Sequence, residues 1–121
     1  MGLIKDREEL TRIMSALFDR VLKEEAIVKE LESANLVIRF RYTDPEAVMT
    51  VDLTRRPPSY RFDDEGEADV GMTQSADVAH QFWLGKMSAV RGIATGKISA
   101  RGNVAKALKL LPAIKPLFAL Y

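Results

Sequence analysis

The chain has 121 residues and a mass of 13.5 kDa, a size that predicts one domain over residues 1–121 with enough chain to bury a core. It contains no cysteine and a single histidine, His80, which excludes disulfides and thiolate chemistry and disfavours most zinc and triad chemistry. Its residues are 47% hydrophobic and 29% charged, as in an ordinary soluble protein, and its N-terminus lacks the apolar run of a signal peptide, so we expect a cytoplasmic location.

The net charge of +1 hides an uneven distribution of charge along the chain. Up to Asp77 the sequence has 11 Lys and Arg residues against 17 Asp and Glu residues, whereas from Val78 onward it has seven basic residues and no acidic one. One interpretation is that the basic part faces an anionic surface, either a membrane or a nucleic acid. The other interpretation is that the two parts pair with each other within the fold.

The first predicted element is a helix. Apolar residues recur three or four positions apart from Leu10 to Leu22, and Asp6 followed by Glu9 is typical of a helix start. The phase of the pattern then changes, which predicts a break over residues 24–26 and a second helical stripe through Leu31. We expect the first stripe to be core, although it is equally suited to line a cavity beside that core.

Four strands are predicted next, because the period of the apolar residues changes to two at Asn35. The predicted strands are residues 36–42, 49–53, 60–62 and 68–72. Each has one apolar and one polar face, a pattern typical of an antiparallel sheet that helices cover on one side only. Pro57 and Pro58 precede the third strand, so we place its start at an edge of the sheet.

An acidic run lies between the third and fourth strands, from Asp63 to Asp69. A metal site is one interpretation, but the run lacks the aspartate spacing and the terminal glutamate of a calcium loop. Gly66 takes an ordinary turn position within it. We therefore predict a solvated hairpin turn and no metal site.

The helical period returns after the fourth strand. Capping residues and glycines divide this part of the chain into a helix from Ser75 to Gly85, a shorter helix from Ser88 to Gly96, a fifth strand over residues 97–101 and further helices after Asn103. His80 lies off the apolar face of the first of these helices, so we expect a surface or supporting residue rather than a catalytic base.

Short segments in this region carry a resemblance to a known family. Residues 68–73 (ADVGMT) precede a helix, residues 84–86 (LGK) follow it, and residues 96–103 (GKISARGN) lead into the helix AKALKL at 105–110. In this combination the chain resembles the sterol carrier protein type 2 (SCP2-like) lipid-binding domain family. The resemblance implies an α+β fold in the order α-β-β-β-β-α-β-α, with a five-stranded, mostly antiparallel sheet covered on one face by helices and an apolar tunnel between them.

The resemblance also implies a non-catalytic function, the binding and transfer or presentation of a lipid such as a sterol, fatty acid, acyl-CoA or isoprenoid. Burial of one methylene contributes about 0.8 kcal/mol, so a tunnel of this kind holds a long chain without specific polar contacts. We expect the tunnel to be lined by Val51, Leu53, Tyr60, Phe62, Phe82, Trp83, Ile93, Leu108, Leu111, Leu117 and Phe118. We expect transient contact between the mouth and an anionic membrane through Arg101, Lys106, Lys109 and Lys115.

The main alternative is a non-enzymatic interaction or scaffold subunit for a lipid- or quinone-modifying enzyme, with filled core in place of a tunnel. Nucleic-acid binding is disfavoured, because no stacking aromatic residues are interleaved with the basic residues after Val78. The sequence predicts no catalytic residue, no cofactor and no metal ligand, and it leaves the oligomeric state open.

Overall fold

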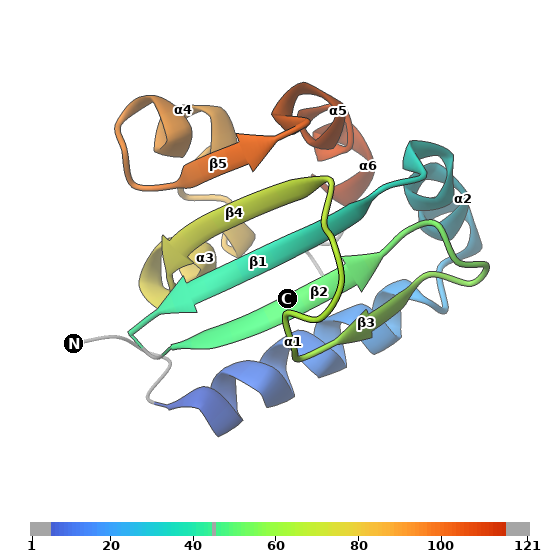
Figure 1. Cartoon of the computed structure of the whole chain (residues 1–121), viewed down its shortest axis with the longest axis horizontal. Helices are drawn as coiled ribbons and strands as arrows, with labels where there is room; N and C mark the ends of the chain where they lie inside the picture. The colour runs from blue at the N-terminus through green and yellow to red at the C-terminus, as the bar shows by residue number, and fades with distance from the viewer. Residues whose placement is uncertain (1–5, 45, 116–121) are drawn as a thin grey trace.

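The sheet is the centre of the molecule, and helices cover one of its two faces (Figure 1). The structure is a computed structural model that describes residues 6–44 and 46–115. Its helices are α1 (Arg7–Val21), α2 (Glu25–Ala34), α3 (Ala76–Trp83), α4 (Ala89–Ala94), α5 (Val104–Leu108) and α6 (Leu111–Ile114). Its strands are β1 (Val37–Thr43), β2 (Ala47–Asp52), β3 (Ser59–Arg61), β4 (Val70–Ser75) and β5 (Ser99–Gly102). The α+β class and the order of elements are those predicted.

The starts of α1, α3, α4 and α5 follow from local capping chemistry, as predicted. Asp6 lies in extended backbone, and its carboxylate accepts a hydrogen bond from the backbone N–H of Glu9 at 2.8 Å. The side chains of Ser75, Ser88 and Asn103 cap α3, α4 and α5 in the same way. The change of phase in the N-terminal pattern corresponds to the break between α1 and α2.

The strand order in the sheet is β3-β2-β1-β4-β5, so the chain crosses β2 and β1 on its way from β3 to β4. Three of the four strand pairings are antiparallel, as predicted. The pairing of β1 with β4 is parallel, with Ile38 opposite Val70 and Tyr42 opposite Gln74. Alternation of apolar residues shows which face of a strand is covered and carries no information on the direction of its neighbour. β3 is an edge strand, in agreement with the two prolines before it.

The core lies between the covered face of the sheet and the helices. Its most buried large side chains include Leu10 of α1, Leu36 before β1, Met49 of β2 and Val70 of β4. Successive strand residues point to opposite faces, so each strand gives alternate apolar residues to this core and polar residues to the uncovered face. The same layer contains the candidate site.

One glycine fixes the junction of β5 with β4. Gly102 has φ of +81°, and a Cβ at this position would overlap the backbone carbonyl oxygen of Asp69. That carbonyl accepts a hydrogen bond from the backbone N–H of Asn103 at 2.9 Å. Both the positive φ and the close approach of the two backbones require glycine here.

The ion pairs among the described residues all lie in the first part of the chain. They join Arg41 to Asp64, Arg55 to Asp52, Arg56 to Glu32 and Arg61 to Asp63. None of the pairs within residues 6–44 and 46–115 includes a basic residue after Val78. Pairing of the basic part with the acidic part therefore does not account for the uneven charge in this portion of the chain.

Candidate functional site

The structure contains an apolar cavity of about 150 Å³ between the covered face of the sheet and the helices. Its wall in the first half of the chain consists of Met14, Leu17, Phe18, Val21, Leu31, Ile38, Phe40, Tyr42, Met49, Val51 and Leu53. In the second half it consists of Met72, Gln74, Ala79, Phe82, Trp83, Ala89, Ile98, Ala107, Leu108, Leu110, Leu111 and Ile114. An apolar cavity of roughly this volume takes a ligand the size of benzene without rearrangement.

The chemistry of the wall favours a neutral, apolar ligand. No charged side chain belongs to the wall in the described part of the chain. Three methionines, Met14, Met49 and Met72, contribute unbranched side chains that adapt to ligands of different shape. An ion placed among such side chains loses its hydration without compensation, so the cavity excludes charged groups.

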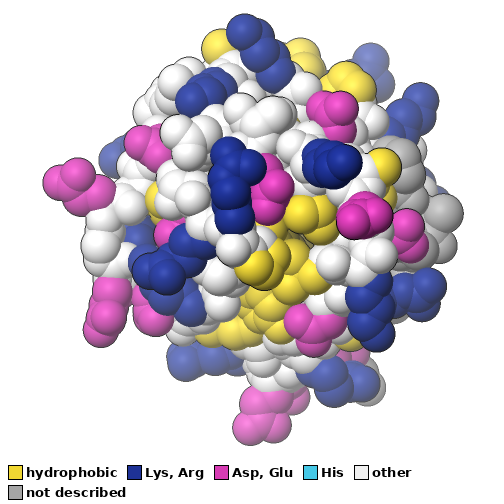
Figure 2. Space-filling view, turned by 90° about the vertical axis from the view of Figure 1, so that its right-hand side faces the viewer, with side chains coloured by type: hydrophobic (Ala, Val, Ile, Leu, Met, Phe, Trp, Pro, Cys, Tyr) yellow, Lys and Arg dark blue, Asp and Glu magenta, His cyan; other side chains and the backbone are white. Residues whose placement is uncertain are grey.

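The cavity extends along β1. Ile38 and Tyr42 both belong to its wall and lie four residues apart on this strand, a separation of roughly 13 Å at about 3.3 Å per residue. α2 lies at the end of the sheet where β1 begins, and α3 lies at the opposite end (Figure 1). Figure 2 looks onto the α2 end and shows a band of hydrophobic side chains at the surface, bordered by charged side chains of both signs. The α2 end is therefore the candidate mouth.

Six of the predicted tunnel residues belong to the cavity wall. They are Val51, Leu53, Phe82, Trp83, Leu108 and Leu111. The rings of Phe82 and Trp83 meet edge to face, with centroids 5.0 Å apart. The fold thus brings together side chains from β2, α3, α5 and α6 that are far apart in the sequence. Predicted residues Leu117 and Phe118 lie outside the described residues.

Three predicted tunnel residues lie outside this wall. The ring centroid of Tyr60 is 4.9 Å from that of Phe18, which does belong to the wall, so Tyr60 lies one layer behind it. Phe62 follows β3 and is 37% exposed, and Ile93 of α4 is half-buried, whereas Ala89 represents α4 in the wall. Alternation on the edge strand predicts its covered face correctly, but α1 lies between that face and the cavity.

Tyr60 instead fastens the edge strand to α1. Its hydroxyl donates a hydrogen bond to Oδ1 of Asp19 at 2.8 Å. Burial and the hydrogen bond to Asp19 together raise the pKa of Tyr60 above its ordinary value. The contact supports Phe18, and with it the cavity wall, from behind.

No residue of α1 is among the predicted tunnel residues. The structure places Met14, Leu17, Phe18 and Val21 in the wall. The only sequence signal for these residues is the apolar stripe of α1, and its spacing is the same whether the stripe packs against other side chains or lines a cavity. Leu10, at the start of that stripe, is 1% exposed and belongs to the packed core, so the helix serves both purposes.

The predicted basic residues divide between two surfaces. Arg101 is exposed on β5, opposite Gly71 of β4, and it lines a groove together with Arg39 and Arg41 of β1. Lys106, Lys109 and Lys115 lie in α5, at its end and at the end of α6, on the side of the sheet that contains the cavity. No helix within the described ranges has the length and apolar character needed to cross a membrane.

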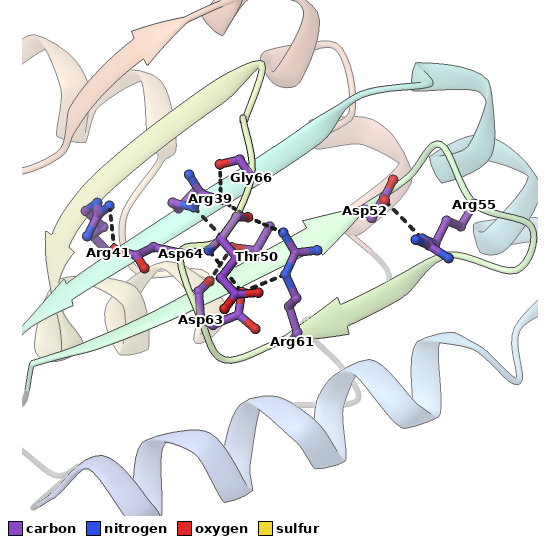
Figure 3. A network of polar contacts seen from close by, with 10 residues as sticks. Arg39, Arg41, Thr50, Asp52, Arg55, Arg61, Asp63, Asp64 and Gly66 are labelled. Atoms are coloured by element: carbon purple, nitrogen blue, oxygen red, sulfur yellow. Dashed lines mark hydrogen bonds and ion pairs between the residues drawn. The ribbon is translucent and has the colours of Figure 1, made fainter.

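The uncovered face of the sheet carries a polar network (Figure 3). Arg39 donates a hydrogen bond to Oγ1 of Thr50 at 3.1 Å and further bonds to the carbonyl oxygens of Glu65 and Gly66 at 2.9 and 3.1 Å. The Thr50 hydroxyl donates to the carbonyl oxygen of Asp63 at 2.6 Å. These bonds hold the connection between β3 and β4 across β1 and β2.

The acidic run belongs to this network. The Asp63 carboxylate accepts a hydrogen bond from Arg61 at 2.7 Å, which together with the backbone N–H of Glu65 lowers the pKa of Asp63 below its ordinary value. Asp64 pairs with Arg41 at 3.3 Å. No group of three or more His, Cys, Asp or Glu residues in the described ranges is arranged to hold a metal ion.

Comparison with known proteins identifies a family and several solved structures that are similar over most of the chain. The family model of the SCP-2 sterol transfer family matches residues 15–115. No curated protein sequence matches the chain significantly. A solved structure titled sterol carrier protein 2 from Yarrowia lipolytica, in its apo form, is 26% identical, with a TM-score of 0.68 over 88% of this chain and 86% of that one.

Two more solved structures share the fold at lower identity. The sterol carrier protein domain 2 of Helicoverpa armigera is 19% identical, with a TM-score of 0.64 over 74% of both chains. A structure titled UbiJ-SCP2 ubiquinone synthesis protein is 15% identical, with a TM-score of 0.69 over 97% of this chain and 95% of that one.

Proposed function

Because the chain belongs to the SCP-2 sterol transfer family, we propose that it is a cytoplasmic, non-catalytic protein that binds an apolar lipid and transfers or presents it. The observation that carries the proposal is the cavity of about 150 Å³, whose wall is uncharged and almost entirely apolar and includes side chains of the helices α1 to α6. Each methylene placed there contributes about 0.8 kcal/mol, so an acyl, isoprenoid or ring system is held by burial alone. The flexible methionine side chains allow the cavity to enlarge around ligands whose volume exceeds that of the empty cavity.

Lipid extraction from the purified protein, followed by mass spectrometry and displacement of a neutral fluorescent lipid, tests the proposal. We expect co-purified apolar lipid in a saturable amount. Ala79→Leu places a larger side chain in the cavity wall and should abolish retention of lipid, whereas the same change at exposed Ala94 should leave it intact. Repeated absence of bound lipid together with no displacement would contradict the proposal.

We further propose that the mouth contacts anionic membranes through Lys106, Lys109 and Lys115. Among the described residues these lysines make no ion pair, and each basic residue near an anionic bilayer contributes about 1 kcal/mol. Replacing all three by Gln should weaken sedimentation with anionic vesicles. The matched control replaces the basic residues at 86, 91 and 97, which belong to α4 and its flanks, and should have a smaller effect. Equal losses of vesicle binding for the two triple variants would contradict the proposed orientation of the mouth toward the membrane.

A second candidate function is that of a scaffold subunit for a lipid- or quinone-modifying enzyme. The similarity over 97% of this chain to the structure titled UbiJ-SCP2 ubiquinone synthesis protein favours this candidate. Affinity purification of the tagged chain distinguishes the two functions. A carrier should be recovered with lipid alone, whereas a scaffold should be recovered with a stoichiometric enzyme partner that Ala79→Leu does not release.

A further inference from the structure

A buried amide group at the α3 end of the cavity has an unsatisfied acceptor. Gln74 belongs to the cavity wall, and the residue is 8% exposed. Its Oε1 is buried and accepts no hydrogen bond. It is the only such side-chain atom among the described residues. Buried polar groups are nearly always paired, and an unpaired one destabilises the protein, so this atom calls for an explanation.

The position of Gln74 follows from the register of the sheet. β4 alternates so that Val70, Met72 and Gln74 point to the covered face, and Gln74 lies opposite Tyr42 of β1. The next residue, Ser75, caps α3. The amide is therefore fixed at the end of the cavity where β4 passes into α3, opposite the candidate mouth at α2.

The surroundings restrict what can satisfy this atom. All other wall residues in the described part are apolar apart from the phenol of Tyr42 and the indole of Trp83. An amide oxygen accepts hydrogen bonds and cannot donate them, so its partner must be a donor. An ionised carboxylate provides no donor for Oε1 and would lose its hydration in an uncharged cavity, so an ionised acid is disfavoured at this end.

We propose that Gln74 is a specificity-determining residue, whose Oε1 accepts a hydrogen bond from a neutral hydroxyl or N–H group carried by the apolar ligand. This inference rests on the proposed function and adds to it the chemical class of the ligand. The favoured ligand is an alcohol or an amide with its donor at the inner end of the apolar body. Hydrocarbons and ionised fatty acids, with no donor to offer, bind less well.

Two isomeric probes, octanol and methyl heptyl ether, test the inference because they have the same atoms and differ in the donor. Their affinities are to be measured by titration calorimetry, with octanoate at neutral pH as the charged comparison. One hydrogen bond to a previously unpaired acceptor corresponds to a preference of roughly fivefold to tenfold for the alcohol. Octanoate should bind more weakly than either neutral probe.

Gln74→Met keeps the length of the side chain and removes the acceptor. In this variant the two isomers should bind equally, while the ether should bind at least as well as to the unchanged protein. Thr73→Val serves as the matched control, because Thr73 directly precedes Gln74 on β4 and points to the uncovered face. This variant should preserve the preference for octanol. The melting temperature of Gln74→Met without ligand should be unchanged or raised, because the variant removes an unpaired polar atom.

The possible outcomes separate this inference from the function beneath it. Equal binding of octanol and the ether to the unchanged protein overturns the role of Gln74 and leaves lipid binding intact. A water molecule bound to Oε1 would give this result. A preference for octanol that survives Gln74→Met also overturns the role of Gln74. A clear fall in the melting temperature of Gln74→Met shows that the amide is paired within the protein and also overturns it. Absence of binding by every probe overturns the proposed function and the inference together.

Discussion

Among the described residues, each face of the sheet has one buried polar side chain, and only one of the two has its hydrogen-bond partners. On the uncovered face Thr50 is 0% exposed, donates a hydrogen bond to Asp63 and accepts one from Arg39. On the helix-covered face Gln74 is 8% exposed and its Oε1 has no partner. The hydrogen bonds of Thr50 are consistent with a structural role, whereas the unpaired oxygen of Gln74 lies beside the cavity, where we propose that it meets the ligand.

The contrast extends to the rest of each face. Arginines on the uncovered face bind the connection between β3 and β4, so its charges are used to hold the chain in place (Figure 3). The covered face contributes apolar side chains to a cavity that the described side chains leave open. We therefore expect changes in the polar network and the packed core to affect stability, and changes in the cavity to affect the proposed lipid binding. The changes below test that division, from the largest expected effect to the smallest.

Gly102→Ala should destabilise the sheet itself and therefore affect both of its faces. The new Cβ would overlap the carbonyl oxygen of Asp69, and φ of +81° is unfavourable for alanine, so β5 must shift away from β4. We expect a loss of about 2–4 kcal/mol in the free energy of unfolding, measured by urea titration. Gly71→Ala is the control, since nothing lies within 4 Å of a Cβ there. Its effect should stay within about 0.5 kcal/mol, and equal losses for the two variants would refute this account of the β4–β5 junction.

Thr50→Val should separate the two faces. The variant keeps the shape of the side chain but leaves the carbonyl of Asp63 and Nε of Arg39 without their partner. The expected loss is about 1–3 kcal/mol in the free energy of unfolding. Gln74→Met, which removes an unpaired acceptor, should cause no such loss. The comparison fails if Gln74→Met is the more destabilising of the two changes.

Tyr60→Phe should weaken the support behind the cavity wall and change the response to alkaline pH. The pKa of Tyr60 is raised in the folded state, so its contribution is complete below the ordinary value of about 10 and is lost as pH rises through the raised pKa. At neutral pH we expect a loss of about 0.5–1 kcal/mol, because the partner Asp19 is exposed. Denaturant titrations of both proteins at neutral and alkaline pH should show this difference shrinking; a constant difference would speak against the Asp19 contact.

Asp63→Asn should have the smallest effect, confined to neutral pH. The pKa of Asp63 is lowered in the folded state by the hydrogen bond from Arg61, so its contribution is present above the ordinary value of about 3.9 and is lost as pH falls through the lowered pKa. The melting temperatures of the two proteins should therefore differ slightly at neutral pH and converge in acid. A difference that grows in acid would have the wrong sign for this pairing.

Much of the fold was predictable because its signals are local. The caps at Asp6, Ser75, Ser88 and Asn103 act within three residues of themselves, and the change of period at Asn35 depends only on neighbouring residues. The order of the strands and the parallel pairing of β1 with β4 were not predictable in this way. They depend on contacts between distant parts of the chain, such as those of Arg39 with the β3–β4 connection.

The cavity was predictable only in part for a related reason. Phe82 and Trp83 are conspicuous as aromatic residues between glycines, whereas the apolar stripe of α1 has the same pattern in a filled core. Tyr60 points to the covered face as predicted, but α1 intervenes. Gln74 continues the alternation of Val70 and Met72, yet a single polar residue before a helix cap is indistinguishable from a solvent-exposed one until the fold is known.

The most direct measurement of the central claim uses Trp83, the only tryptophan of the chain and a member of the cavity wall. A brominated long-chain alcohol quenches tryptophan emission only at close range, so titration with it reports occupancy of this cavity. A lipid-binding cavity predicts saturable quenching of Trp83 that is lost in Ala79→Leu and retained in Ala94→Leu. Emission that stays unchanged, or quenching that is equal in the two variants, would contradict the claim that the cavity binds an apolar ligand.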